Sequence, residues 1–130
     1  MAYTTYGERW DTQDVFTATA GEAIAFARAC VKFESEGVVI KTVADTDVAV
    51  GLSADIYADE EQCEYLQRGR LDFIAGGTVA VGDQLCPDDG TAGRIRTAIA
   101  GDLVVGTATV AASVGEKCTG DFDFVAATVL

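Results

Sequence analysis

Residues 69–130 consist of short apolar runs separated by glycine–aspartate turns, and this pattern constrains the fold more than any other feature of the chain. Glycine, aspartate and small β-branched residues suit tight turns and pleated strands, and they disfavour helices. The single proline, Pro87, stands beside a turn sequence at residues 88–90. The pattern therefore predicts an all-β fold, a small β-barrel or sandwich.

The apolar runs also predict where the strands lie. Residues 24–33 form an apolar stretch that predicts one nearly continuous strand, and residues 103–110 predict a second, buried one. From residue 63 onward the odd positions are expected to face inward, which leaves Asp72 on the outside. Gly69 interrupts that run, which indicates a bulge or a close approach of another backbone.

The first fourteen residues fit none of these patterns. We predict an extended N-terminal arm over residues 1–14, followed by a single β-barrel-like domain over residues 15–130. Tyr3, Tyr6 and Trp10 stand on the arm. They either fold back over one end of the core or lie on a neighbouring protein, because tyrosine and tryptophan are frequent anchors of interfaces. These three are the candidate partner-binding residues.

Composition narrows the range of functions. A chain of 130 residues is long enough to bury one core without staples. Its hydrophobic residues are mostly alanine and valine, and such a thin core favours burial completed by oligomerisation.

The 21 acidic and 9 basic residues give a net charge of −12. We therefore expect no nucleic-acid partner and no anionic membrane partner, because both are bound through lysine and arginine.

The acidic residues are densest between residues 45 and 64. Seven of them fall in this stretch, with no basic residue among them. Two interpretations remain open. The stretch is either a solvated face that aids solubility, or a patch that steers the protein toward a basic partner.

Nothing in the sequence predicts catalysis, a cofactor or a metal site. The chain has no histidine, so neither Cys63 nor Cys118 has the usual base that would activate a thiol. Turn formation already explains the paired aspartates at 45/47, 88/89 and 121/123, which could otherwise contribute to a calcium site. No lysine stands in the hairpin-tip context that a biotinyl or lipoyl carrier domain needs.

The cysteines and the first residues indicate the compartment. No CxxC motif is present, and the spacings fit no zinc pattern. The polar start lacks the apolar core of a signal peptide. We expect synthesis in a reducing cytosol, with free and mostly buried thiols. The four cysteines are Cys30, Cys63, Cys86 and Cys118.

The order of short motifs resembles that of the capsid decoration (cement, head-stabilising) proteins of tailed bacteriophages. The stretch VADTDVAVGLSAD at residues 43–55 also matches, so the resemblance covers residues 37–130. The motifs of the C-terminal half are the strand Gly69–Phe73, Gly82-Asp83-Gln84-Leu85, Asp88-Asp89-Gly90, Gly93-Arg94, Gly106-Thr107-Ala108, Ala111-Ala112-Ser113 and Gly115-Glu116.

The resemblance implies a non-enzymatic structural protein of the virion. Such a protein would be made in the host cytoplasm and would dock on the outer capsid surface as a homotrimer, at threefold and quasi-threefold positions. Its partners would be the major capsid protein, whose neighbouring copies it cements, and itself. The main alternative is a soluble β-barrel interaction module of a cellular complex, and a carrier domain or an enzyme is less favoured.

Overall fold

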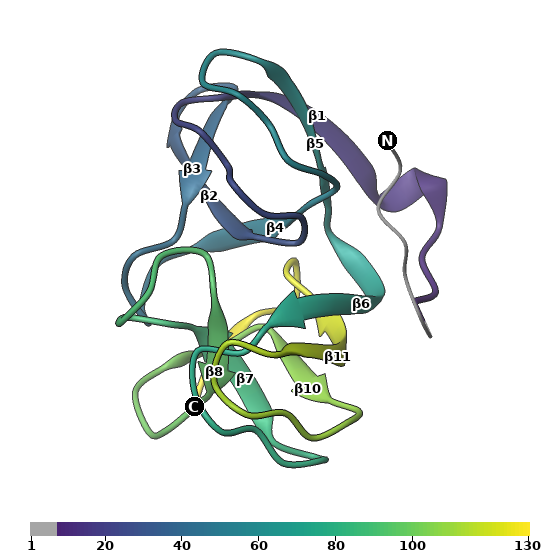
Figure 1. The fold of residues 1–130 in the computed structure, drawn as a ribbon, viewed down its shortest axis with the longest axis vertical. Coiled ribbons are helices and arrows are strands. Elements are labelled where there is room, and N and C mark those ends of the chain that lie inside the picture. The colour runs from purple at the N-terminus through teal and green to yellow at the C-terminus, as the bar shows by residue number, and fades with distance from the viewer. Residues whose placement is uncertain (1–7) are drawn as a thin grey trace.

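The computed structural model describes residues 8–130, and these form an all-β protein, as predicted (Figure 1). Within this range no helix is long and apolar enough to cross a membrane. The elements are the 3-10 turn η1 (Thr12–Asp14) and the strands β1 (Val15–Ala20), β2 (Cys30–Ser35), β3 (Val38–Lys41), β4 (Ala49–Ser53), β5 (Gln62–Leu66), β6 (Arg68–Ile74), β7 (Gln84–Pro87), β8 (Ile95–Thr97), β9 (Leu103–Val104), β10 (Gly106–Ala108), β11 (Lys117–Asp123) and β12 (Thr128–Val129).

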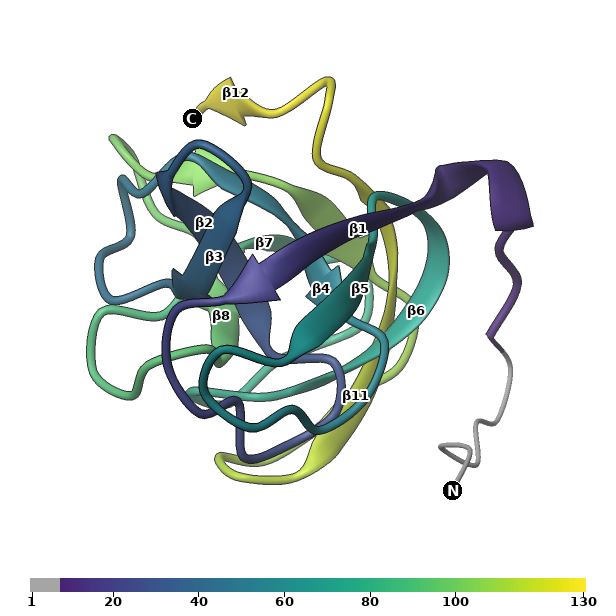
Figure 2. The ribbon, with the colours of Figure 1, turned by 90° about the horizontal axis from the view of Figure 1, so that it is seen from above.

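The first five strands close into a barrel in the order β1-β3-β2-β4-β5. Strand β5 pairs antiparallel with β1 and completes the closure, which Figure 2 shows from above. Small side chains such as Ala18, Ala20 and Ala29 lie inside, so the strands can curve tightly around a narrow interior. At one end the ring of Tyr65 stacks on Phe16 at 5.8 Å and meets Phe33 edge-on at 6.1 Å.

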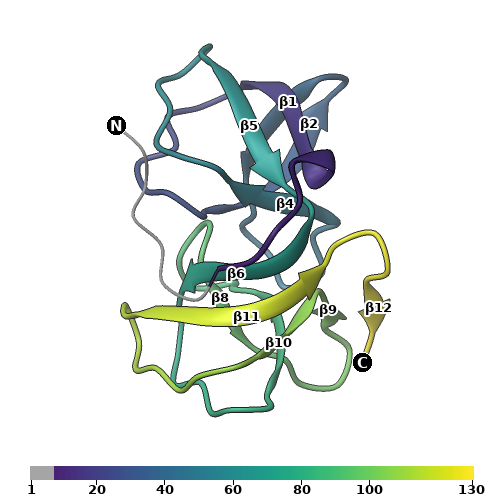
Figure 3. The ribbon, with the colours of Figure 1, turned by 90° about the vertical axis from the view of Figure 1, so that its right-hand side faces the viewer.

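The remaining strands form a second layer beneath the barrel (Figures 1 and 3). Five of them make a sheet in the order β6-β11-β10-β7-β8, and β12 pairs separately with β9. Strands β6 and β11 run antiparallel from the Arg68–Asp123 pair to the Ile74–Lys117 pair. The closed barrel therefore spans residues 15–66, and residues 68–129 build the second layer.

The larger core lies where the two layers meet. Leu52 and Leu66 belong to barrel strands but pack in the same cluster as Leu71 and Phe73 of β6. Phe122 meets Phe73 edge-on, with ring centroids 5.5 Å apart. This aromatic and aliphatic cluster joins the barrel to the sheet.

The strand predicted at residues 24–33 begins only at Cys30. Arg28 has a positive φ of 63°, a conformation that breaks an extended strand, and its side chain turns into the protein. Ile24 instead forms a single bridge to Tyr57. A lone arginine in an apolar run was the sign that this strand is interrupted.

The strand pattern is irregular in two further places. The strand expected at residues 103–110 is divided at Val105, because β9 pairs with β12 whereas β10 pairs with β7 and β11. In β4 the buried residues do not alternate, since Leu52 faces the second sheet while Val50 packs against the barrel interior. Val48 is left 76% exposed. A strand packed on both faces loses the period of two.

Carboxylate groups close the tight turns that the sequence motifs mark. Gly82 has a φ of 87°, and Asp83 Oδ2 accepts the N–H of Ala80 at 2.9 Å. In the same arrangement Glu116 Oε1 accepts the N–H of Ser113 at 2.7 Å. The backbone hydrogen bond lowers the pKa of Asp83. These turns need a residue of each type, which explains the Gly-Asp and Gly-Glu pairs physically.

Candidate partner-binding surface

The described part of the N-terminal segment is attached to the second sheet. Arg9 and Arg70 exchange two backbone hydrogen bonds, of 2.8 and 2.7 Å, so the segment adds to the edge of β6. Gly69 makes this approach possible, because a Cβ atom there would stand 2.5 Å from the carbonyl oxygen of Arg9. The close backbone approach predicted at Gly69 is confirmed, and the predicted arm is held to the body from residue 8.

A buried ion pair fixes the same segment. The Nε and Nη2 atoms of the Arg28 guanidinium each donate to the carboxylate of Glu8 at 2.8 Å. The side chain of Arg28 is 4% exposed and that of Glu8 is 1% exposed. Arg28 also donates to the carbonyl of Ala54 at 2.5 Å. Glu8 accepts the backbone N–H of Asp72 at 2.7 Å. One carboxylate therefore joins the N-terminal segment, the barrel and β6.

Asp72 was predicted to face outward, and this was wrong. It is 1% exposed, because the N-terminal segment and Lys117 cover the face of β6 on which it stands. Its Oδ1 accepts the hydroxyl of Thr119 at 2.8 Å, and its Oδ2 has no hydrogen-bond donor within the described residues. Burial raises the pKa of the Asp72 carboxyl above its ordinary value.

A groove of about 290 Å³ opens beside this attachment. Its lining joins the N-terminal segment to barrel strands: Trp10, Val15, Ala54, Glu64 and Leu66. Leu66 is fully buried, whereas Trp10 is 41% exposed. Of the candidate partner-binding residues, Trp10 thus lies at the wall of a groove. Tyr3 and Tyr6 lie outside the described residues.

The acidic stretch separates into two parts. Asp45 pairs with Arg96 at 2.8 Å, and Asp47 pairs with Lys32 at 3.1 Å, so these two serve the fold. The loop before β5 holds most of the others, and it lies at the barrel end away from the second sheet (Figures 1 and 3). Among the described residues no ion pair involves Asp55, Asp59, Glu60, Glu61 or Glu64.

Arg96 gathers carboxylates that could otherwise have suggested a cation site. Besides Asp45, its guanidinium lies 3.0 Å from Asp102, 3.4 Å from Asp89 and 3.7 Å from Asp88. The arrangement ties the loop after β3 to the loops around β8. In the described part of the chain no three histidine, cysteine or acidic side chains are placed to hold a metal ion.

The four thiols are free and buried. Burial is the main cause that raises the pKa of each, to about 12 for Cys30 and for Cys86. The Cys86 thiol also donates to Asp102 at 3.5 Å. Thiols held in this way stay protonated at neutral pH and pack as small apolar groups.

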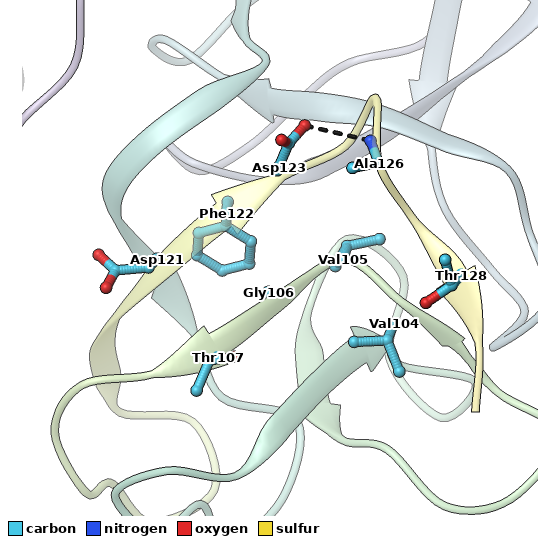
Figure 4. Close-up of a pocket in the computed structure, with 9 residues that line it drawn as sticks. All are labelled: Val104, Val105, Gly106, Thr107, Asp121, Phe122, Asp123, Ala126 and Thr128. Atoms are coloured by element: carbon cyan, nitrogen blue, oxygen red, sulfur yellow. Dashed lines mark hydrogen bonds between the residues drawn. The ribbon is translucent and has the colours of Figure 1, made fainter.

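A second pocket, also of about 290 Å³, lies between β10, β11 and the C-terminal segment (Figure 4). The Phe122 ring covers Gly106, where a Cβ atom would stand 2.7 Å from the ring. Asp123 Oδ1 accepts the N–H of Ala126 at 3.1 Å, which turns the chain toward β12. The lining offers the carboxylates of Asp121 and Asp123 and the hydroxyls of Thr107 and Thr128.

Comparison with known proteins gives a match of fold. No protein-family model and no curated protein sequence matches the chain. The structure is similar to the crystal structure of the N base of the head fiber gp8.5 in bacteriophage phi29, with a TM-score of 0.64. The match covers 89% of this chain and 96% of that chain at 19% identity. At this identity the likeness shows a shared fold, and the resemblance to decoration proteins stays a prediction.

Proposed function

We propose that the protein is a structural component of a tailed-phage head that docks on the outer surface of the capsid. The observation that carries the proposal is the fold shared, over nearly the whole of both chains, with the base of a phage head fiber. The ordered sequence motifs that resemble decoration proteins support the same assignment, and they do not depend on the fold match.

Its action is mechanical. The protein bridges adjacent copies of the major capsid protein, and many weak contacts repeated around a symmetric shell hold the capsomers together through avidity. It acts without a catalytic residue, a cofactor or a nucleic-acid partner. It is made in the host cytoplasm and attaches during assembly.

The functional form is a homotrimer at threefold and quasi-threefold positions. The narrow, alanine-rich barrel interior supports this, because a small core gains from further burial between copies. Exposed apolar side chains are available for such contacts, among them Val125 at 68% and Val129 at 69% exposure.

The test uses undecorated shells of the phage that encodes this chain. Full-length protein should co-sediment with them, and electron microscopy should place it on the outer surface in threefold clusters. Absence from purified virions, or density inside the shell, would contradict capsid docking. Sedimentation equilibrium measures association in solution, and copies seen singly on the shell would overturn the trimer.

A further inference from the structure

We infer that the groove between Trp10 and Glu64 receives a basic side chain, a lysine or an arginine, from the surface of the partner protein. The inference rests on the proposed function only for the identity of that partner, the capsid. The groove, its charge and its chemistry are properties of this chain alone.

The shape of the groove suits a long side chain with an apolar stem. Val15 of β1 and Leu66 of β5 are paired across the strands and form its apolar floor together with Ala54. Trp10 forms one wall. Its Cβ lies so close to Gly69 that a Cβ added at that glycine would be only 2.8 Å away from it. The tryptophan is therefore held against β6, while 41% of its surface stays open to a ligand.

The charge of the groove selects a cation. Glu64 is exposed and has no ion pair among the described residues. Arg68, a nearby cation on β6, is paired with Asp14 at 3.1 Å. The charge that lines the groove is therefore the negative charge of the Glu64 carboxylate.

Arg9 does not compete for Glu64. It lines a different groove, with Gly69, Arg70, Asp121 and Phe122, on the other side of the N-terminal segment. Successive side chains of an extended backbone point to opposite sides, so Arg9 and Trp10 diverge.

An arginine or a lysine matches each part of this surface. The methylene stem covers the apolar floor, and the cationic end reaches the Trp10 ring and the Glu64 carboxylate. An apolar side chain would desolvate Glu64 without compensation.

A second copy of this chain is a poorer source of the cation. Seven of its nine basic residues are already in ion pairs: Arg28, Lys32, Lys41, Arg68, Arg70, Arg96 and Lys117. A partner with unpaired surface cations therefore fits the groove better.

Trp10 is the only tryptophan of the chain, so its fluorescence reports directly on the groove. The probes are blocked glycine–serine pentapeptides with a central arginine, lysine or citrulline, the last being an uncharged analogue of arginine. The arginine and lysine peptides should change the emission saturably, and citrulline should bind several-fold more weakly. Equal binding of arginine and citrulline, or no saturable change with either charged peptide, overturns the inference.

Substitution of the carboxylate separates the groove from general acidity. Glu64→Gln should weaken binding of the arginine peptide about two- to fivefold, as expected for loss of an exposed ion pair, without changing binding of citrulline. The matched control is Glu36→Gln, an exposed acid in the β2–β3 turn, which should change neither. If both variants weaken binding equally, net charge and not the groove is responsible, and the inference fails.

The same two variants are then bound to undecorated shells. Loss of attachment with Glu64→Gln, but not with Glu36→Gln, supports the inference on the capsid itself. Shells that bind Glu64→Gln as well as the unsubstituted protein overturn the groove as a docking site and leave the proposed function standing. Peptide binding without any attachment to shells refutes the proposed function and leaves a groove for a different basic partner.

Discussion

The barrel and the second sheet differ in what fills them. The barrel interior is small, with alanines, Cys63 and a few larger residues such as Ile24. The cluster between barrel and sheet contains Phe73, Phe122 and most of the leucines. The barrel is closed by hydrogen bonds, but most apolar burial lies outside it, on the side facing the sheet. We infer that the barrel depends on the sheet for its stability more than the sheet depends on the barrel interior.

The largest effect is expected from Phe73→Ala, because Phe73 is 1% exposed at the junction of the two layers. It should lower the free energy of unfolding by about 3–5 kcal/mol. The location is compared with one and the same deletion, Ile95→Val in the cluster between the layers and Ile24→Val inside the barrel, of which the second should cost less within a range of about 0.5–1.5 kcal/mol. Urea unfolding measures all three. Equal costs at the two isoleucines would show that the barrel has a core of its own.

A slightly smaller loss, of about 3 kcal/mol, is expected from Glu8→Gln, because the buried Arg28 would lose the carboxylate charge that accepts two of its hydrogen bonds. The matched variant is Asp14→Asn, which breaks the more exposed pair with Arg68 and should cost about 0–1 kcal/mol. Chemical denaturation compares them. If Glu8→Gln costs no more than Asp14→Asn, the N-terminal segment does not link barrel and sheet.

Gly69→Ala should cost about 1–3 kcal/mol, because the residue has a φ of 131° and an added Cβ would meet Arg9. Gly37→Ala is the control, since its φ is also positive, at 74°, but the space around it is open. Hydrogen exchange at the Arg70 amide should accelerate in the first variant only. Unchanged exchange there would show that the segment tolerates the Cβ.

The smallest effect concerns pH. Burial raises the pKa of Asp72 in the folded state above its value in the unfolded chain, so the folded protein loses stability as pH rises from the unfolded pKa through the folded one. As the pH rises from acid to neutral, the Asp72→Asn variant should therefore gain stability relative to the unsubstituted protein. Melting curves at several pH values test this, and a shift in the opposite direction would contradict the assignment.

The sequence predicted the second sheet better than the barrel. Phe122 alternates with aspartates along β11, and one face of that strand is buried, so a period of two describes it correctly. Around the barrel the same rule failed, because β4 packs on both faces and Arg28 interrupts an apolar run. The all-β class followed from turn chemistry and alternation, which are local properties.

The candidate site was predictable only in part. Trp10 was selected as an exposed aromatic, whereas Glu64 was one of many acidic residues with nothing to distinguish it. The contacts that hold Trp10 in place link Glu8 to Arg28 and Asp72, and pairings over such sequence separations leave no periodic signal. A charged residue inside an apolar run, as at Arg28, is the one local sign of a buried partner.

In related chains, the residue at position 69 indicates whether the N-terminal segment is attached in the same way. Any residue larger than glycine at this position conflicts with the segment in its present place, so a substitution there should mark a lineage in which the segment has moved or been lost. In such lineages the acid at position 8 and the arginine at position 28 should disappear together, because each would lose the buried charge that it is paired with here. The residues at positions 8, 28 and 69 therefore predict from sequence alone whether the N-terminal segment links the barrel to the sheet.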